Sequence, residues 1–140
     1  MTVYWAPFLH AYQPPWQDVE VLKKIYSECY KPLLSMVERH KNAKITLNIQ
    51  GCLLDQLGEL SLENARLLTQ KLIDEQKVEL VGSAKFHPIL PLIPEQEVNN
   101  QIKLNQDTLK HYFTNYHIDG FFPPEMAVSP EICSLIKNNG

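Results

Sequence analysis

Hydrophobic residues recur along this chain in two alternating patterns. Short apolar runs rich in β-branched and aromatic residues, typical of strands covered on both faces, occupy residues 2–9, 44–49, 78–81 and the segment from residue 121. Between them, apolar positions return every three or four residues, which predicts helices over about 17–39, 52–57, 61–73 and 94–112, with a last one after residue 129. Strand followed by helix, four times over, predicts a parallel α/β sheet.

Proline and capping residues refine these boundaries. Pro7 weakens the first strand, because proline donates no ladder hydrogen bond, and Pro32 should kink or restart the first helix. Ser61 and Ser129 are predicted N-caps of the helices that follow them. The pair at 119–120, Asp-Gly, is expected to turn the chain into the fourth strand.

Composition narrows the class of protein. A length of 140 residues, of which 44% are apolar, suits one domain with a real core. The formal charge of -3 offers no broad cationic surface for nucleic acid or an anionic membrane, so a neutral substrate fits better. No basic leader precedes the first strand, and no run approaches the roughly 18 apolar residues of a membrane span. A cytoplasmic protein is therefore predicted.

The three cysteines form no pattern that binds zinc or builds a disulfide framework. Cys29, Cys52 and Cys133 are far apart and make no CxxC pair. We expect all three to be buried, reduced thiols.

Four strand-helix units are half of the usual eight-stranded barrel, which has about 250 residues. Half a barrel would leave two exposed parallel edges, which stable proteins normally cover. Residues 1–140 are therefore predicted to be a truncated N-terminal portion of a single catalytic barrel, with the rest of the barrel as its partner. An open four-stranded sheet that folds alone is the alternative, and the pattern leaves the oligomeric state open.

Unusual polar and aromatic residues gather where the predicted strands end. They are His10, Tyr12, Gln13 and Trp16 near strand one, Asn48 and Gln50 after strand two, Glu79, Lys85 and His87 near strand three, and Glu125 after strand four. In parallel α/β folds the carboxyl ends of the strands form one rim, and this rim holds the working residues. The loops at the opposite end are plain connectors, so the rim is the predicted active-site face.

Two glutamates are the candidate carboxylates. The prolines at 123–124 stiffen the exit from strand four, and so could fix Glu125 for nucleophilic attack on an anomeric carbon; the alternative is a helix-flanking cap. Glu79 lies within an apolar strand, where a charge needs a partner such as Lys85 or a sugar hydroxyl. Its alternative is a surface glutamate on an edge strand.

Histidines and aromatic residues on the rim suit a sugar. His10 and His87 could bind hydroxyl groups or, as a further option, a metal, and each could also be an ordinary half-buried histidine. Tyr12 and Trp16, in the first loop, offer faces on which a pyranose ring can stack. The aromatic residues of the first strand are expected in the core instead.

These segments together resemble the N-terminal part of glycoside hydrolase family 57, the retaining enzymes of α-glucan metabolism. The matching runs are residues 8–14, 45–57, 78–82, 86–91 and 120–125. The first is similar to a His-x-His-Gln-Pro type of region, with Tyr12 where the second histidine often stands. The last resembles the region that holds the family's nucleophile.

The resemblance implies a (β/α)7 barrel, present here as roughly its first four βα units, acting on α-glucan as a glycosidase or 4-α-glucanotransferase without a cofactor. Carried over, Glu125 would be the nucleophile. The subsites near the cleaved bond would be lined by His10, Tyr12, Gln13, Glu79 and His87. The family's acid/base aspartate would lie beyond Gly140, so the 140-residue chain alone is expected to be inactive on its oligosaccharide or polysaccharide substrate.

Two other functions stay open. A metal-dependent carbohydrate deacetylase or mannosidase could share the barrel, but such sites want Asp and His ligands close together, and Asp18 lies beyond a proline-rich turn from His10. No metal ligand is therefore assigned. A non-catalytic sugar-binding or scaffold module would keep the same rim residues without chemistry.

Overall fold

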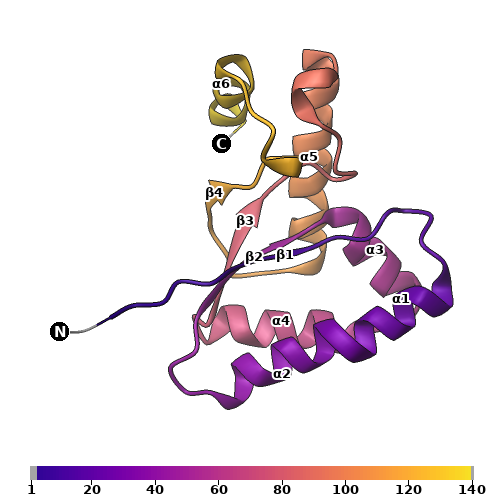
Figure 1. The fold of residues 1–140 in the computed structure, drawn as a ribbon, viewed down its shortest axis with the longest axis vertical. Coiled ribbons are helices and arrows are strands. Elements are labelled where there is room, and N and C mark those ends of the chain that lie inside the picture. Colours follow the sequence, from indigo (N-terminus) through magenta and orange to yellow (C-terminus); the bar gives the residue numbers. More distant parts are fainter. Residues whose placement is uncertain (1–2, 140) are drawn as a thin grey trace.

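In a computed structural model that describes residues 3–139, four parallel strands form one sheet in the order β1-β2-β3-β4 (Figure 1). The strands are β1 (Phe8–Ala11), β2 (Ile45–Ile49), β3 (Val78–Gly82) and β4 (Ile118–Phe121). The first two connections contain α1 (Val19–Ile25), the π-helical turn η1 (Tyr26–Tyr30), α2 (Lys31–Arg39), α3 (Gly51–Glu59) and α4 (Glu63–Asp74). The remaining helices are η2 (Leu90–Leu92), α5 (Glu95–Tyr112), η3 (Pro124–Met126) and α6 (Pro130–Asn138).

The two faces of the sheet have different surroundings. Ile45, Leu47 and Leu80 point toward the helices and belong to the main core, together with buried leucines of α2, α3 and α4. In Figure 1, α2 and α4 lie side by side along this face. Because side chains alternate along a strand, Thr46 and Glu79 point to the opposite face, where Glu79 is exposed. The sheet therefore has one packed face and one open face.

A second, smaller core joins the last two long helices. Val98 and Ile102 of α5 pack with Ile132 of α6, and with Ala84 and Leu90 from the loop after β3. Figure 1 shows α5 and α6 beside β3 and β4, on the other side of the sheet's end from α2 and α4, while α3 lies against α5. This cluster holds the segment after β4 against the segment after β3, and so brings two distant parts of the rim together.

The first strand is shorter than its sequence predicts. Pairing begins where the amide of Thr46 donates to the carbonyl of Pro7, and β1 starts at Phe8. Tyr4 and Trp5 are 89% and 88% exposed, so their predicted place in the core is wrong. Proline supplies an acceptor but no donor, which makes Pro7 a natural start for the ladder.

Of the two predicted N-caps, Ser129 is confirmed and Ser61 is wrong. Ser129 caps α6, since its hydroxyl oxygen accepts from the amide of Ile132. Ser61 does not cap α4: it has a left-handed φ of 55°, and the helix begins two residues later at Glu63 without a side-chain cap. The predicted turn at 119–120 is also wrong, because both residues lie within β4.

The interruption expected at Pro32 is present as a π-helical turn. The amide of Lys31 donates to the carbonyl of Tyr26, five residues back, and α2 then starts with Pro32 in its first turn. Proline has no amide hydrogen to offer, so it suits a helix start and disrupts a helix interior. The helix predicted over 17–39 is therefore present as three consecutive segments from Val19 to Arg39.

The cysteines differ from expectation at two of three positions. Cys52 is buried in α3, but Cys29 and Cys133 are exposed, so the prediction of three buried thiols is wrong for these two. Cys29 lies in η1, whose buried side chain is Tyr26, and Cys133 lies in α6, which buries Ile132. Within residues 3–139, no helix is both long and apolar enough to cross a membrane.

Candidate active site

Side chains from all four strand ends meet at the carboxyl rim of the sheet. We call this group the rim cluster; its members are His10, Tyr12, Asn48, Gln50, Ser83, His87, Phe122 and Glu125. Parallel pairing puts these strand ends at one edge, with His10 opposite Asn48 in the register of β1 and β2. Five of the eight were predicted as site residues: His10, Tyr12, Asn48, His87 and Glu125.

Three rings of the rim cluster lie nearly parallel. The centroids of Tyr12 and His87 are 4.4 Å apart with 21° between their planes, and those of His10 and His87 are 5.0 Å apart with 26° between them. Phe122 adds a fourth ring, tilted by 38° and 4.9 Å from His10. Such offset stacks stabilise ring pairs beyond the burial of their area. They fix the planes of both histidines.

Two buried amide side chains form hydrogen bonds with Nδ1 of the two histidine rings. Oδ1 of Asn48 is 2.7 Å from Nδ1 of His10, and Nε2 of Gln50 is 2.7 Å from Nδ1 of His87. Both amide side chains are fully buried. Gln50 also donates to Oγ of Ser83 at 3.0 Å, and Ser83 in turn donates to the carbonyl of Phe122 at 2.8 Å.

Glu125 meets His87 at the top of the rim cluster. Its Oε1 lies 3.1 Å from Nε2 of His87, whose side chain is only 5% exposed, whereas the Glu125 side chain is 66% exposed. The carboxylate is thus held at one oxygen and open to solvent at the other side. Glu125 has a left-handed φ of 57° within η3, directly after the two prolines.

Burial changes the protonation of two members. The pKa of His87 is lowered, chiefly because burial disfavours the imidazolium, with the charge of His10 adding to this and the bond to Glu125 opposing it. Burial likewise raises the pKa of the Tyr12 hydroxyl, and the negative charge of Glu125 adds to the rise. At neutral pH, His87 is therefore a neutral imidazole and Tyr12 a neutral phenol.

Glu79 lies on the open face of the sheet and has a different partner from the one predicted. Its Oε2 accepts a 2.8 Å hydrogen bond from the hydroxyl of Thr46. The expected pairing with Lys85 is wrong, because that ammonium group binds Asp55 at 2.8 Å. In the ladder Glu79 pairs with Thr46, two positions before Asn48 on β2, so it lies deeper along the sheet than the rim cluster.

Gln13 and Trp16 lie on the loop after β1, outside the rim cluster. Gln13 donates from Nε2 to the hydroxyl of Tyr30 at 3.2 Å, which ties this loop to η1. Trp16 is 83% exposed, so its faces are free for a ligand rather than engaged with the cluster. These two residues extend the candidate surface along the loop.

Ser83 and Phe122 are members that the sequence did not single out. Gln50 stood on the predicted rim but was not assigned a role. Ser83 follows the apolar run of β3, and Phe122 follows that of β4, so a period-two reading of each strand could have found them. Their contacts to one another depend on how β3 and β4 pair, with an irregular register between Leu80 and Gly82, which a sequence pattern does not reveal.

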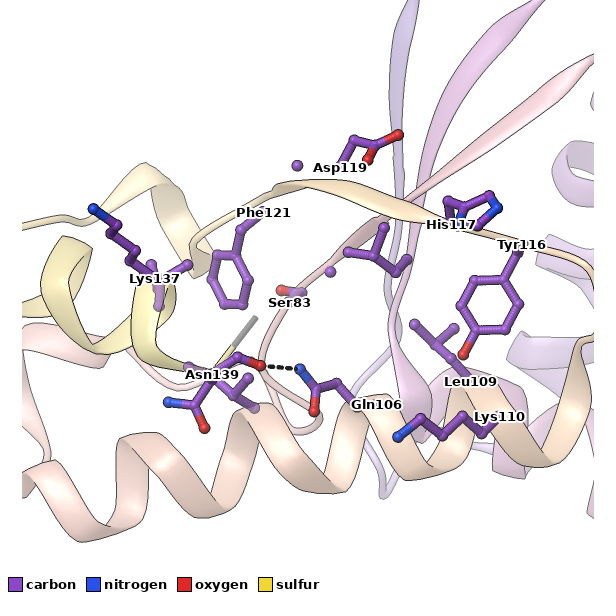
Figure 2. Close-up of a pocket in the computed structure, with 15 residues that line it drawn as sticks. Ser83, Gln106, Leu109, Lys110, Tyr116, His117, Asp119, Phe121, Lys137 and Asn139 are labelled. Carbon is purple, nitrogen blue, oxygen red and sulfur yellow. Dashed lines mark hydrogen bonds between the residues drawn. The ribbon is translucent and has the colours of Figure 1, made fainter.

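One cavity lies apart from the predicted site residues. It has a volume of about 620 Å³ and lies between α5, α6 and β4 (Figure 2). Ser83 is the one member of the rim cluster that lines it, and the hydrogen bond from Gln106 to the carbonyl of Asn139 closes one side. Among the described residues, no three His, Cys, Asp and Glu side chains gather as a metal site would require.

Comparison with known proteins gives a consistent match. The model of glycosyl hydrolase family 57 matches residues 4–140. An α-amylase from Pyrococcus horikoshii is 30% identical over 132 residues, which make up 94% of this chain and 20% of the amylase. The crystal structure of 4-α-glucanotransferase from Thermococcus litoralis superposes with a TM-score of 0.88 at 23% identity, covering 96% of this chain and 21% of that one.

The fold is shared more widely. A CE4 family pseudoenzyme from Bacillus anthracis superposes with a TM-score of 0.62 at 15% identity, over 95% of this chain and 40% of that one. The predicted parallel α/β architecture, four βα units of a (β/α)7-type barrel, is confirmed by these likenesses and by the strand order. The chain spans about a fifth of the length of the curated relatives it matches.

Proposed function

The chain belongs to glycosyl hydrolase family 57, and on this premise we propose that it supplies the nucleophile side of a retaining active site for α-linked glucans. The observation that carries the proposal is the contact between Glu125 and His87, 3.1 Å long, at the rim where four parallel strands end. This is the position at which barrel enzymes carry out their chemistry.

Glu125 has the properties that a nucleophile in this reaction needs. One carboxylate oxygen accepts from His87, and the exposed side chain leaves the other free to approach a sugar. In the first step the free oxygen bonds to the anomeric carbon, and the glycosidic bond breaks as its oxygen takes a proton from a general acid. Water or a sugar hydroxyl then attacks the anomeric carbon and releases the carboxylate.

The rest of the rim cluster suits recognition of the sugar. The rings of His10 and Tyr12 both stack with the ring of His87, which contacts Glu125. Imidazole, phenol and amide groups can donate to and accept from sugar hydroxyls. We assign His10, Tyr12 and His87 to the subsite next to the cleaved bond, with the buried Asn48 orienting the ring of His10. Gln13 and Trp16 extend this surface along the loop after β1, and Glu79 extends it along the open face of the sheet.

The second carboxyl of a retaining pair is assigned to another part of the barrel. In such enzymes the two carboxyl groups lie about 5 to 5.5 Å apart. Among residues 3–139, Glu125 is the one carboxylate that hydrogen-bonds within the rim cluster. β1 and β4 are both edge strands, and relatives are about five times as long, which supports residues 1–140 as the first four βα units of a larger barrel.

On this proposal the 140-residue chain binds its oligosaccharide weakly and does not turn it over. General acid catalysis contributes about 10² to 10⁴ in rate, so without it the first step is slowed by at least this factor. Turnover of maltooligosaccharide by the chain alone would contradict this assignment. A cytoplasmic location stays a prediction of the sequence.

Replacement of Glu125 tests the function in the complete protein. Glu125→Gln keeps the shape of the side chain but removes the nucleophile, so turnover of maltooligosaccharide should fall by at least about 10³-fold while binding survives. Glu131→Gln, an exposed acid in the first turn of α6, is the matched control and should leave turnover unchanged. Full activity in Glu125→Gln would exclude Glu125 as the nucleophile. Sugar binding without turnover in the unmutated protein would identify a binding module instead.

A further inference from the structure

We propose that Ser83 and Gln50 are positioning residues that lock His87 in the tautomer with its proton on Nε2, so that it always donates to Glu125. This inference rests on the proposed function, because it deepens the role of the same site. It follows from the direction of four consecutive hydrogen bonds, which run from the carbonyl of Phe122 through Ser83, Gln50 and His87 to Glu125.

The donor and acceptor of each hydrogen bond are set by a backbone carbonyl at one end of the series. The carbonyl of Phe122 can only accept, so the 2.8 Å bond uses the single hydroxyl hydrogen of Ser83. Having no second hydrogen, Oγ of Ser83 must accept in its 3.0 Å bond with Gln50. The group of Gln50 that faces Ser83 is therefore the NH₂, and the orientation of this buried amide is fixed.

The second hydrogen of the same NH₂ group reaches His87. Nε2 of Gln50 lies 2.7 Å from Nδ1 of His87, and both of its hydrogens are now assigned to acceptors. Nδ1 must then carry a lone pair. In a neutral imidazole the proton is left on Nε2, which is the atom 3.1 Å from Oε1 of Glu125.

The consequence for Glu125 is both geometric and electrostatic. A donor fixed at Nε2 stabilises the ionised carboxylate and holds one of its oxygens in place. Protonation of Nδ1 would direct its hydrogen at the NH₂ of Gln50, so the imidazolium is disfavoured. The groups that face the ring are Glu125, His10 and Tyr12, and burial lowers the pKa of His87 in the same direction.

Nitrogen NMR of the histidine rings in the complete protein tests whether His87 is held in the Nε2-protonated tautomer. In the unmutated protein His87 should show an unprotonated Nδ1 and a protonated Nε2 at neutral pH. Gln50→Glu replaces the donor by a carboxylate, so Nδ1 should become protonated and the pKa of His87 should rise. The exposed His40 and His111 serve as internal controls for folding, and their signals should not move.

Ser83 offers a matched pair of variants. Ser83→Ala removes the group that orients Gln50, so His87 should become a mixture of tautomers, and kcat should fall by about 10- to 100-fold with little change in KM. Ser83→Thr keeps the hydroxyl and should restore the single Nε2-protonated form. A purely structural role for Ser83 would lower stability without changing the tautomer.

Two outcomes would overturn the proposal: a proton on Nδ1 of His87 in the unmutated protein, or an unchanged tautomer in both Gln50→Glu and Ser83→Ala. These readouts do not depend on turnover. If Glu125→Gln stays active while the His87 tautomer changes as expected in the Gln50 and Ser83 variants, the tautomer proposal stands and the nucleophile assignment fails. If the tautomer of His87 is unchanged in the Gln50 and Ser83 variants while Glu125→Gln is inactive, the nucleophile assignment stands and the tautomer proposal fails.

Discussion

His87 and Glu125, 38 residues apart in sequence, share a 3.1 Å hydrogen bond and also share an unusual backbone conformation, with φ values of 58° and 57°. Left-handed backbone costs a non-glycine residue roughly 1–2 kcal/mol. Strain at both ends of one hydrogen bond indicates that the surrounding segments, the loop after β3 and η3 after β4, are held in place by the small core between α5 and α6.

The first prediction concerns the ring of His87. His87→Phe keeps a ring to stack on Tyr12 and His10 but removes the donor to Glu125 and the acceptor for Gln50. In the complete enzyme kcat should fall about 10- to 100-fold, by analogy with the loss of groups that orient other reactive residues. Steady-state kinetics on maltooligosaccharide measure this. A kcat that stays within about twofold would mean that the bond has no part in catalysis.

The second prediction is a pH dependence of stability. In the folded chain the pKa of His87 is lowered below the ordinary value of about 6.5. Between the two values the unfolded chain binds more protons, so the stability linked to His87 is fully present above about pH 6.5 and is lost as the pH falls through the folded value. Urea unfolding at a series of pH values should show this decline, and His87→Phe should flatten it. An equal slope in both proteins would contradict it.

The third prediction uses the end of α4. Gln76 has a φ of 56°, its amide donates to the carbonyl of Ile73, and the amide of Lys77 donates to that of Leu72. This is a Schellman motif, in which glycine is preferred at the left-handed position. Relief of the left-handed strain, roughly 1–2 kcal/mol, exceeds the entropy that glycine costs, so Gln76→Gly should stabilise the chain by about 0.5–1 kcal/mol, measured by urea unfolding. Gln76→Ala is the control, and a gain of the same size there would show that backbone strain is not the cause.

The fourth prediction concerns the thiols. Cys29 and Cys133 are exposed, whereas burial raises the pKa of Cys52 to about 11. Because the thiolate is the reactive form, a thiol reagent should label two cysteines of the native 140-residue chain quickly and the third only on unfolding. Fast labelling of all three would mean that α3 opens readily from the sheet.

The order of the helices and strands could be predicted because each is marked by a pattern of apolar residues within its own segment. The apolar runs of β2 and β3 and the helical spacing in α5 are properties of neighbouring residues, so their boundaries were found to within one or two positions. Errors arose where the outcome depends on contacts between distant segments. Residues 3–6 resemble a strand but belong to no strand in the structure, and Gly120 lies inside β4, where the register between β3 and β4 is irregular.

Part of the candidate site could also be predicted from the sequence, and part could not. The rule that strand ends meet at one rim identified His10, Asn48, His87 and Glu125, which do come together. Ser83 was missed because a lone serine is marked only by its place in the period of two along β3, and not by its residue type. The partner of Glu79 was predicted wrongly because register, which puts Thr46 beside it, is not visible in the sequence.

The central claim is that Glu125 is the nucleophile, and a trapped intermediate tests it most directly. A fluorinated α-glucosyl substrate that forms the glycosyl-enzyme quickly and releases it slowly should leave the sugar on one carboxylate of the complete protein. Peptide mass spectrometry should find that sugar on Glu125. A sugar found on any other carboxylate would contradict the account.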